Sequence, residues 1–162
     1  MQVDANSADA TMLRTYADAL AEGIEASLPG WVQRCVEGVM TAWAGELPGV
    51  VASAAEDAGR RAAVETGSAL RALLATDVDE QVTGPLALLR EAVKWPTAVL
   101  AAAHVPPVQR DAFAERAFPA DVYDLAPASF ADVDPALQDP GIAWGAAKAH
   151  VVLARRRTEG RR

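Results

Sequence analysis

Residues 31–43 read WVQRCVEGVMTAW, and they carry the clearest amphipathic pattern in the chain. Their apolar side chains recur at intervals of three and four, which is typical of one face of an α-helix: Val32, Cys35, Val36, Val39, Met40 and Trp43. The stretch lies between "SLPG" at 27–30 and "ELPG" at 46–49. Proline disfavours helical geometry at the residue before it. The sequence therefore predicts that a first helix ends at Leu28 and that a separate second helix ends before Pro48.

Helical spacing also precedes and follows this stretch. Ser7 is predicted to cap the first helix. A third helix is expected over about residues 50–75, where Ala54, Ala58 and Ala62 form a small-residue stripe that lets a neighbouring helix approach closely. Residues 1–76 are therefore predicted to form an N-terminal helical hairpin or three-helix unit.

The second half of the chain begins with a capping-box pattern, Asp77 followed by Glu80. The pattern predicts a fourth helix that stops at "KWP", after which Pro96 begins a short helix. This fourth helix is expected to carry Val82, Leu86, Leu89 and Val93.

From residue 105 to residue 140 the chain holds six of its ten prolines, and no stretch alternates as a strand would. The sequence predicts short helices between proline turns, one of them near residues 107–117. Asp134 before Pro135 is typical of a helix N-cap with proline at the first helical position. The last helix is expected from about Gly141 to Arg156. Four aromatic residues are expected to anchor this region on the bundle: Phe113, Phe118, Tyr123 and Phe130.

These patterns predict an all-α fold, a small helical bundle with a proline-rich, loop-containing C-terminal half closed by a final helix. Hydrophobic residues make up 51% of the chain, which is enough for a core. The expected organisation is an N-terminal unit at 1–76, a C-terminal helical region packed on it at 77–157, and a disordered basic tail at 158–162.

Charge is distributed unevenly. The formal net charge is −7, yet residues 155–162 hold five arginines and one glutamate and carry +4, which leaves −11 for the rest of the chain. An acidic body repels nucleic acid and anionic membrane, so both are disfavoured as partners. Arg155, Arg156 and Arg157 either complement the negative end of the last helix or contact a partner.

The number of cysteines and the N-terminal residues indicate the cellular compartment of the protein. Cys35 is the one cysteine, so no intramolecular disulfide forms, as is usual in a reducing cytosol. The opening residues have no secretory signal pattern, and the most apolar windows are too short to span a bilayer. The protein is expected to be soluble and cytoplasmic.

Candidate chemical groups are few, and the sequence predicts no catalytic residue, cofactor or metal. His104 is expected to cap a helix, and His150 to be a hydrogen-bonded core or boundary residue, because neither lies in a metal-binding spacing. The Asp77–Asp79 and Asp132–Asp134 clusters lack the glycine and glutamate that a calcium loop requires. Helix capping is the simpler interpretation of both. Cys35 lies on an apolar stripe, where a thiol behaves as a small hydrophobe.

The last helix contains the unusual stretch GIAWGAAKAHVVLA at 141–154. Gly141 and Gly145 are four residues apart, as are Ala143 and Ala147, so a second helix can approach the backbone closely. The stripe is either buried within the fold or a surface for a partner, with Trp144 filling the adjoining groove.

Three stretches in residues 85–157 resemble a group of proteins from high-GC Gram-positive (actinobacterial) bacteria to which no activity is assigned. They are WPTAVLAAAHVPPVQRDAFAERAFP, DVDPAL and PGIAWGAAKAHVVLARRR. The resemblance implies a bacterial, cytoplasmic setting and transfers no site residue.

The function predicted from the sequence is a non-catalytic adaptor or regulator that binds another protein or itself. Its C-terminal half would present an acidic surface studded with aromatic residues, with the arginine tail as an auxiliary contact. The alternative is a small-molecule-binding protein or enzyme with a pocket near Trp95, His104, Tyr123 and Trp144. A deep pocket in which a histidine meets a carboxylate would favour the alternative.

Overall fold

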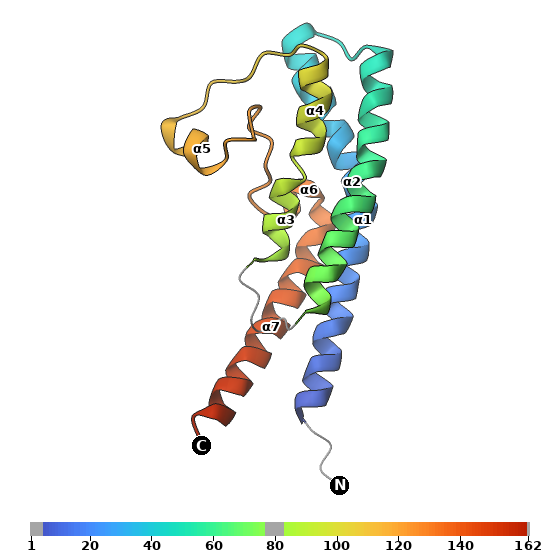
Figure 1. The fold of residues 1–162 in the computed structure, drawn as a ribbon. Coiled ribbons are helices and arrows are strands. Elements are labelled where there is room, and N and C mark those ends of the chain that lie inside the picture. The colour runs from blue at the N-terminus through green and yellow to red at the C-terminus, as the bar shows by residue number, and fades with distance from the viewer. Residues whose placement is uncertain (1–4, 77–82, 162) are drawn as a thin grey trace.

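The computed structural model describes residues 5–76 and 83–161, and side chains from residue 8 onward. Every regular element in these ranges is helical, which confirms the predicted all-α class. Figure 1 shows an elongated bundle of helices with a loop-rich segment projecting from it. The elements are α1 (Ala5–Ala44), α2 (Gly49–Ala75), α3 (Pro85–Glu91), α4 (Lys94–Ala102), α5 (Ala112–Ala117), α6 (Phe130–Val133), the 3₁₀ turn η1 (Pro135–Leu137) and α7 (Gln138–Glu159).

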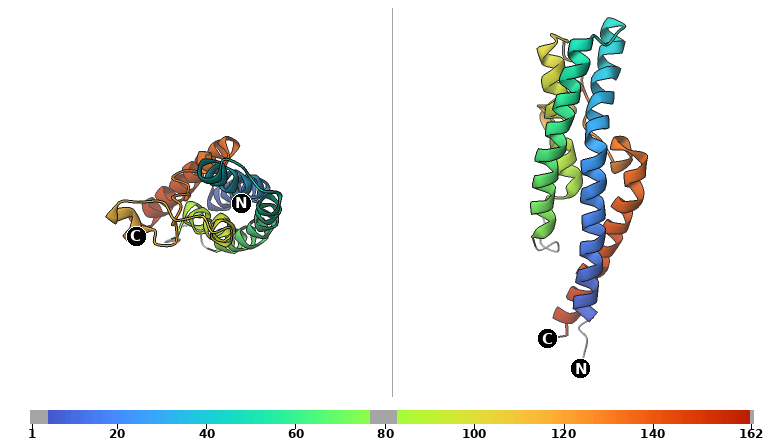
Figure 2. Two further views of the ribbon diagram at one scale, coloured as in Figure 1. Left: turned by 90° about the horizontal axis from the view of Figure 1, so that it is seen from above. Right: turned by 90° about the vertical axis from the view of Figure 1, so that its right-hand side faces the viewer.

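Helices α1 and α2 form a long antiparallel hairpin, and the other elements pack around it. The two helices lie side by side in every view (Figures 1 and 2). Helix α7 packs on α1, and α4 packs on both α1 and α2. Fully buried side chains follow one face of α1 from Leu20 through Ile24, Leu28 and Val32 to Val36. Burying each of them stabilises the fold by about 1.5–3 kcal/mol.

Helix α1 continues through Pro29, so the predicted break at Leu28 is wrong, and the N-terminal unit is a hairpin of two helices. Pro29 has no N–H to donate to the carbonyl of Glu25, which costs a helix interior about 3 kcal/mol. Packing outweighs that cost because Leu28 and Val32, on either side of the proline, are both fully buried. Helix α2 also approaches here, since a Cβ at Gly59 would lie 2.9 Å from the Cα atom of Pro29.

The small-residue stripe of α2 differs from the prediction at one of its three positions. Ala58 and Ala62 are buried as expected, but Ala54 is exposed and Ala55 is buried in its place. Ser7 lies inside α1 and does not precede it, because the helix begins at Ala5. The predicted cap of Asp77 and Glu80, with Val82, lies outside the described residues.

The predicted fourth helix is observed as α3, which ends at Glu91, before Val93. The predicted stop at "KWP" is wrong, because Lys94, Trp95 and Pro96 form the first turn of α4, where proline is tolerated since its missing N–H has no partner in the helix. Two of the expected apolar residues, Leu89 and Val93, are buried in the core. Helix α4 ends in a Schellman motif, in which Val105 N–H donates to Leu100 O at 3.1 Å and His104 N–H donates to Ala101 O at 3.0 Å. His104 adopts a φ of 63° there, a position that glycine usually occupies. The prediction that His104 terminates a helix is confirmed.

Two of the four predicted aromatic anchors are exposed. Tyr123 is buried, and Phe130 packs so closely on α7 that a Cβ at Gly141 would lie 2.5 Å from its ring. Phe113 and Phe118, in contrast, are 72% and 40% exposed. The reason is that α5 projects from the bundle, as Figure 1 shows, so Phe113 packs on no helix of the bundle and Phe118 reaches only Arg90 of α3.

The final helix, α7, is longer than expected at both ends. Asp134 caps η1 through a 2.9 Å bond from Ala136 N–H to its Oδ1, which confirms the predicted Asp134–Pro135 helix start. At the other end the predicted disorder of residues 158–162 is wrong for Thr158 and Glu159, which are helical. Arginine favours helix, and cations stabilise the helix C-terminus, so the helix continues through the basic run.

Candidate functional site

The Asp132–Asp134 cluster and Cys35 serve the fold, whereas the Asp77–Asp79 cluster lies outside the described residues. Asp132 Oδ2 accepts bonds from Ala128 N–H and Ser129 N–H at 2.9 and 3.0 Å, so helix capping is confirmed for the second cluster. Burial raises the pKa of the Cys35 thiol to about 12, which keeps it neutral and weakly nucleophilic. Within residues 5–76 and 83–161, no group of three or more histidine, cysteine or acidic side chains is placed to hold a metal ion.

The four residues of the predicted pocket lie in different surroundings in the described structure. Trp95 lines a shallow depression on α2 and α4 with Arg61 and Val64. His104 is exposed, whereas Tyr123 is buried and donates from its Oη to Val105 O at 2.8 Å. Trp144 is buried on α7, and Lys148 lies 5.2 Å from its ring centre.

His150 lies at the boundary of the fold, which is one of the two positions that the sequence predicts, and not in the core. Its side chain is 62% exposed, and its Nε2 lies 3.5 Å from Asp9 Oδ2. The histidine therefore links the outer ends of α7 and α1. Helix periodicity explains the boundary position, because the buried face of α7 passes through Ala147 and Val151 and places His150 at its edge.

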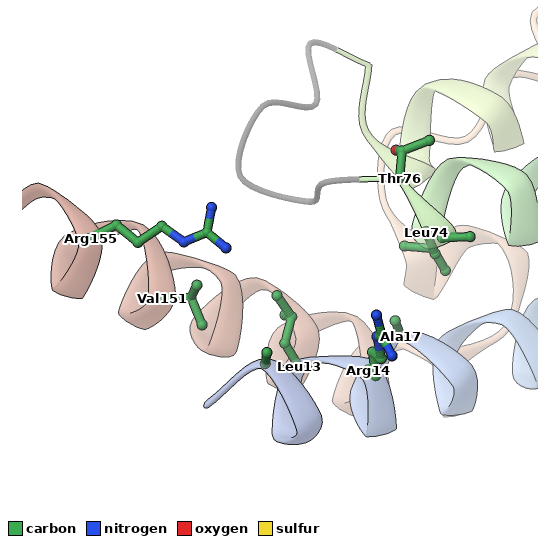
Figure 3. A pocket seen from close by; sticks show the side chains of 9 residues that line it. Leu13, Arg14, Ala17, Leu74, Thr76, Val151 and Arg155 are labelled. Atoms are coloured by element: carbon green, nitrogen blue, oxygen red, sulfur yellow. The ribbon is translucent and has the colours of Figure 1, made fainter. Parts of the chain in front are cut away.

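The three predicted arginines of the tail point in different directions around α7. Arg155 reaches a cavity of about 280 Å³ between α1, the end of α2 and α7, which also includes Leu13, Arg14 and Val151. Figure 3 shows side chains of all three helices facing this space. Arg156 and Arg157 are exposed on other sides of the helix.

Residues 108–120, which contain α5, form a projecting arm whose two ends are held together. Val108 N–H donates to Val122 O at 3.0 Å, next to the bond from Tyr123 to Val105 O. Burial raises the pKa of the Tyr123 hydroxyl, so it stays a donor over the whole neutral range. The arm is thus a compact loop closed at its base.

Hydrogen bonds also fix the interior of the arm. Asp111 caps α5 by accepting from Ala114 N–H at 2.7 Å. Arg110 Nη1 donates to Phe118 O at 2.7 Å and so connects the start of the arm to its end. Directly after the arm, the buried Asp121 accepts from Leu125 N–H and Ala126 N–H at 2.7 and 2.9 Å and so fixes the segment that follows it. These bonds give the arm a defined shape although it makes little contact with the bundle.

The arm places two aromatic side chains at the surface, and one of them, Phe118, lines a depression. Phe113 is 72% exposed on α5, and Phe118 lies 5.9 Å from the Arg90 guanidinium, measured from its ring centre. A depression of about 490 Å³ separates the arm from α3 and α4. The arm itself carries two arginines and two acidic residues, so it has no net charge. The surface therefore combines exposed aromatic side chains with charged side chains of both signs.

No protein-family model matches the chain, and neither the curated proteins nor the solved structures include a match. The resemblance to actinobacterial proteins therefore stays a prediction. In the part of the chain that the structure describes, no helix combines the length and the apolar character needed to cross a membrane.

Proposed function

We propose that this protein is a small cytoplasmic adaptor or regulator that binds another protein through the arm at residues 108–120. The single observation that carries the proposal is the 72% exposure of Phe113 on a segment that hydrogen bonds hold in shape. Leaving a phenylalanine in water forgoes about 1.5–3 kcal/mol of burial energy. Aromatic anchors of this kind supply much of the binding energy at protein interfaces.

The shape of the arm supports the same proposal. A loop that is already ordered loses less conformational entropy on binding than a flexible one. Phe113 would insert into an apolar pocket of the partner, while a partner side chain would occupy the depression beside Phe118. Because the arm is neutral, the contact would depend on apolar area and only weakly on salt.

The arginine tail supports this contact less than the sequence led us to expect. Figure 1 places the C-terminal end of α7 toward the opposite end of the molecule from α5. The tail and the arm are therefore separate surfaces, and the proposal rests on the arm alone.

The test is co-purification from the native lysate with wild type, Phe113→Ser and Val64→Ser. Val64 is the matched control because it is also 72% exposed but lies on α2. We expect a partner that wild type and Val64→Ser retain and Phe113→Ser loses. With that partner purified, Phe113→Ser should raise the Kd at least tenfold, or about 1.4 kcal/mol. Equal retention by all three proteins, with unchanged circular dichroism, would contradict the proposal.

A further inference from the structure

Helix α7 has an exposed face that no described element covers. Six residues on it alternate at intervals of three and four, and all six are exposed. We call them the outer α7 seam: Asp139, Ile142, Ala146, Ala149, Leu153 and Arg156. The opposite face of the same helix is buried through Trp144, Ala147 and Val151, mainly against α1.

The outer α7 seam has large apolar side chains toward its two ends and small ones at its centre. Ile142 and Leu153 are 61% and 54% exposed and stand about 16 Å apart along the helix, at 1.5 Å per residue. Ala146 and Ala149 lie between them, and a Cβ at the adjoining Gly145 would meet no atom within 4 Å. The alternating spacing is the one by which two helices interlock along a seam. Small residues at its centre allow their axes to approach closely.

The charged residues at the two ends of the outer α7 seam determine which partner helix can bind there and in which orientation it runs. Consider a second copy of α7 that runs antiparallel to the first, with the two-fold axis between residues 147 and 148 of both copies. Ile142 of each copy then faces Leu153 of the other, the alanines face each other, and Asp139 faces Arg156. A parallel pair would instead bring Asp139 against Asp139 and Arg156 against Arg156, which repels.

The neighbouring charges leave this face open. Lys148 lies over the ring of Trp144, and His150 is directed toward Asp9 on α1. The seam is therefore an apolar stripe with one acidic and one basic end, and it is complementary to itself in one orientation. A face of that kind is what a two-fold symmetric contact requires.

We propose that two copies of this chain associate through the outer α7 seam as an antiparallel, two-fold symmetric helix pair. The pairing does not involve the arm, so it stands or falls separately from the proposed adaptor function. It gives Arg156 a defined role, namely an ion pair with Asp139 of the second copy at each end of the contact.

Sedimentation velocity over a range of concentrations tests the pairing. We expect wild type to dimerise and Ala149→Glu to be monomeric with an unchanged melting temperature, because the substituted side chain is exposed in the monomer. Ala54→Glu is the matched control, since Ala54 is an exposed alanine on α2; it should dimerise like wild type. A wild type that stays monomeric, or a dimer that persists in Ala149→Glu, would overturn the proposal.

Charge reversal tests the orientation. Asp139→Arg and Arg156→Asp should each raise the dimer Kd on the order of tenfold, because each converts two attractive contacts into repulsive ones. The double variant restores opposite charges and should recover the wild-type Kd. A double variant that dimerises no better than either single variant would refute the antiparallel pairing.

Disulfide trapping tests the register. Chains carrying Ile142→Cys should cross-link with chains carrying Leu153→Cys under mild oxidation, because these positions face each other. Neither variant alone should cross-link, since like positions in an antiparallel pair lie about 16 Å apart along the axis. Wild type controls for the half-buried Cys35. Cross-linking of a single variant with itself would indicate a parallel pair and contradict the proposal.

Discussion

Replacing Gly59 with alanine tests the closest approach of α1 and α2. The added Cβ would lie 2.9 Å from both Cα and O of Pro29, and both are backbone atoms that cannot rotate away. The helices would have to separate by about half an ångström to reach ordinary contact, and overpacking of this kind costs about 1–3 kcal/mol. Alanine in place of glycine recovers about 1 kcal/mol of helix propensity. The expected net loss is up to about 2 kcal/mol, or up to roughly 4–8 °C in Tm for a chain of this size.

The assay is urea unfolding followed by far-ultraviolet circular dichroism, with Gly38→Ala as the matched control. Gly38 is also inside a helix, but a Cβ there would meet no atom within 4 Å. Gly38→Ala should therefore stabilise the protein by up to about 1 kcal/mol. Opposite signs for the two substitutions are expected. Stabilisation by both would refute the close contact at Pro29 and, with it, the packing that carries α1 through the proline.

Three further predictions concern single side chains. His104→Gly should raise the free energy of unfolding by about 1 kcal/mol, because histidine pays a steric cost at a φ of 63° that glycine does not; a lower Tm would contradict the Schellman motif. The Arg71 ion pair, with Nε–Oε1 at 2.8 Å, holds the pKa of Glu25 below its usual range. Because the pKa of Glu25 is lower in the folded protein than in the unfolded chain, the ion pair stabilises the fold at pH values above the ordinary glutamate pKa. This stabilisation is lost as the pH falls through the pKa of the folded state. Arg71→Gln should therefore flatten the acid limb of a stability-against-pH curve, and a curve identical to wild type would exclude the pair. Native Cys35 should resist alkylation at pH 8 and react in urea, because burial raises its pKa to about 12; rapid reaction of the folded protein would show that the thiol is accessible.

The sequence predicts the helices better than it predicts their ends. The all-α class, the Asp134–Pro135 start and the helix end at His104 follow from local patterns. Capping and hydrophobic periodicity depend only on residues that are close in the sequence. The continuation of α1 through Pro29 does not, since it depends on Gly59, which is 30 residues away in the chain. Proline signals are reliable only where no tertiary contact compensates for them.

The exposed surfaces were harder to predict because an apolar residue looks the same in a sequence whether it is buried or not. In the sequence, Phe113 is as good a candidate for a buried aromatic anchor as Tyr123. Phe113 is exposed and Tyr123 is buried only because α5 projects from the bundle. The four-residue spacing of Gly141 and Gly145 predicts one stripe, but the first packs against Phe130 and the second is exposed. Residues four apart differ by about 40° around a helix, which is enough to separate the inner face of α7 from the outer one.

The central claim is that Phe113 on the arm contacts another protein, and site-specific photo-cross-linking in native cells measures that contact directly. A photoreactive phenylalanine analogue is placed at position 113 in one variant and at position 64 in a second, at sites of equal exposure. The account predicts one defined adduct of higher mass from position 113 and none from position 64. The absence of an adduct at 113, or the same adducts from both positions, would contradict it.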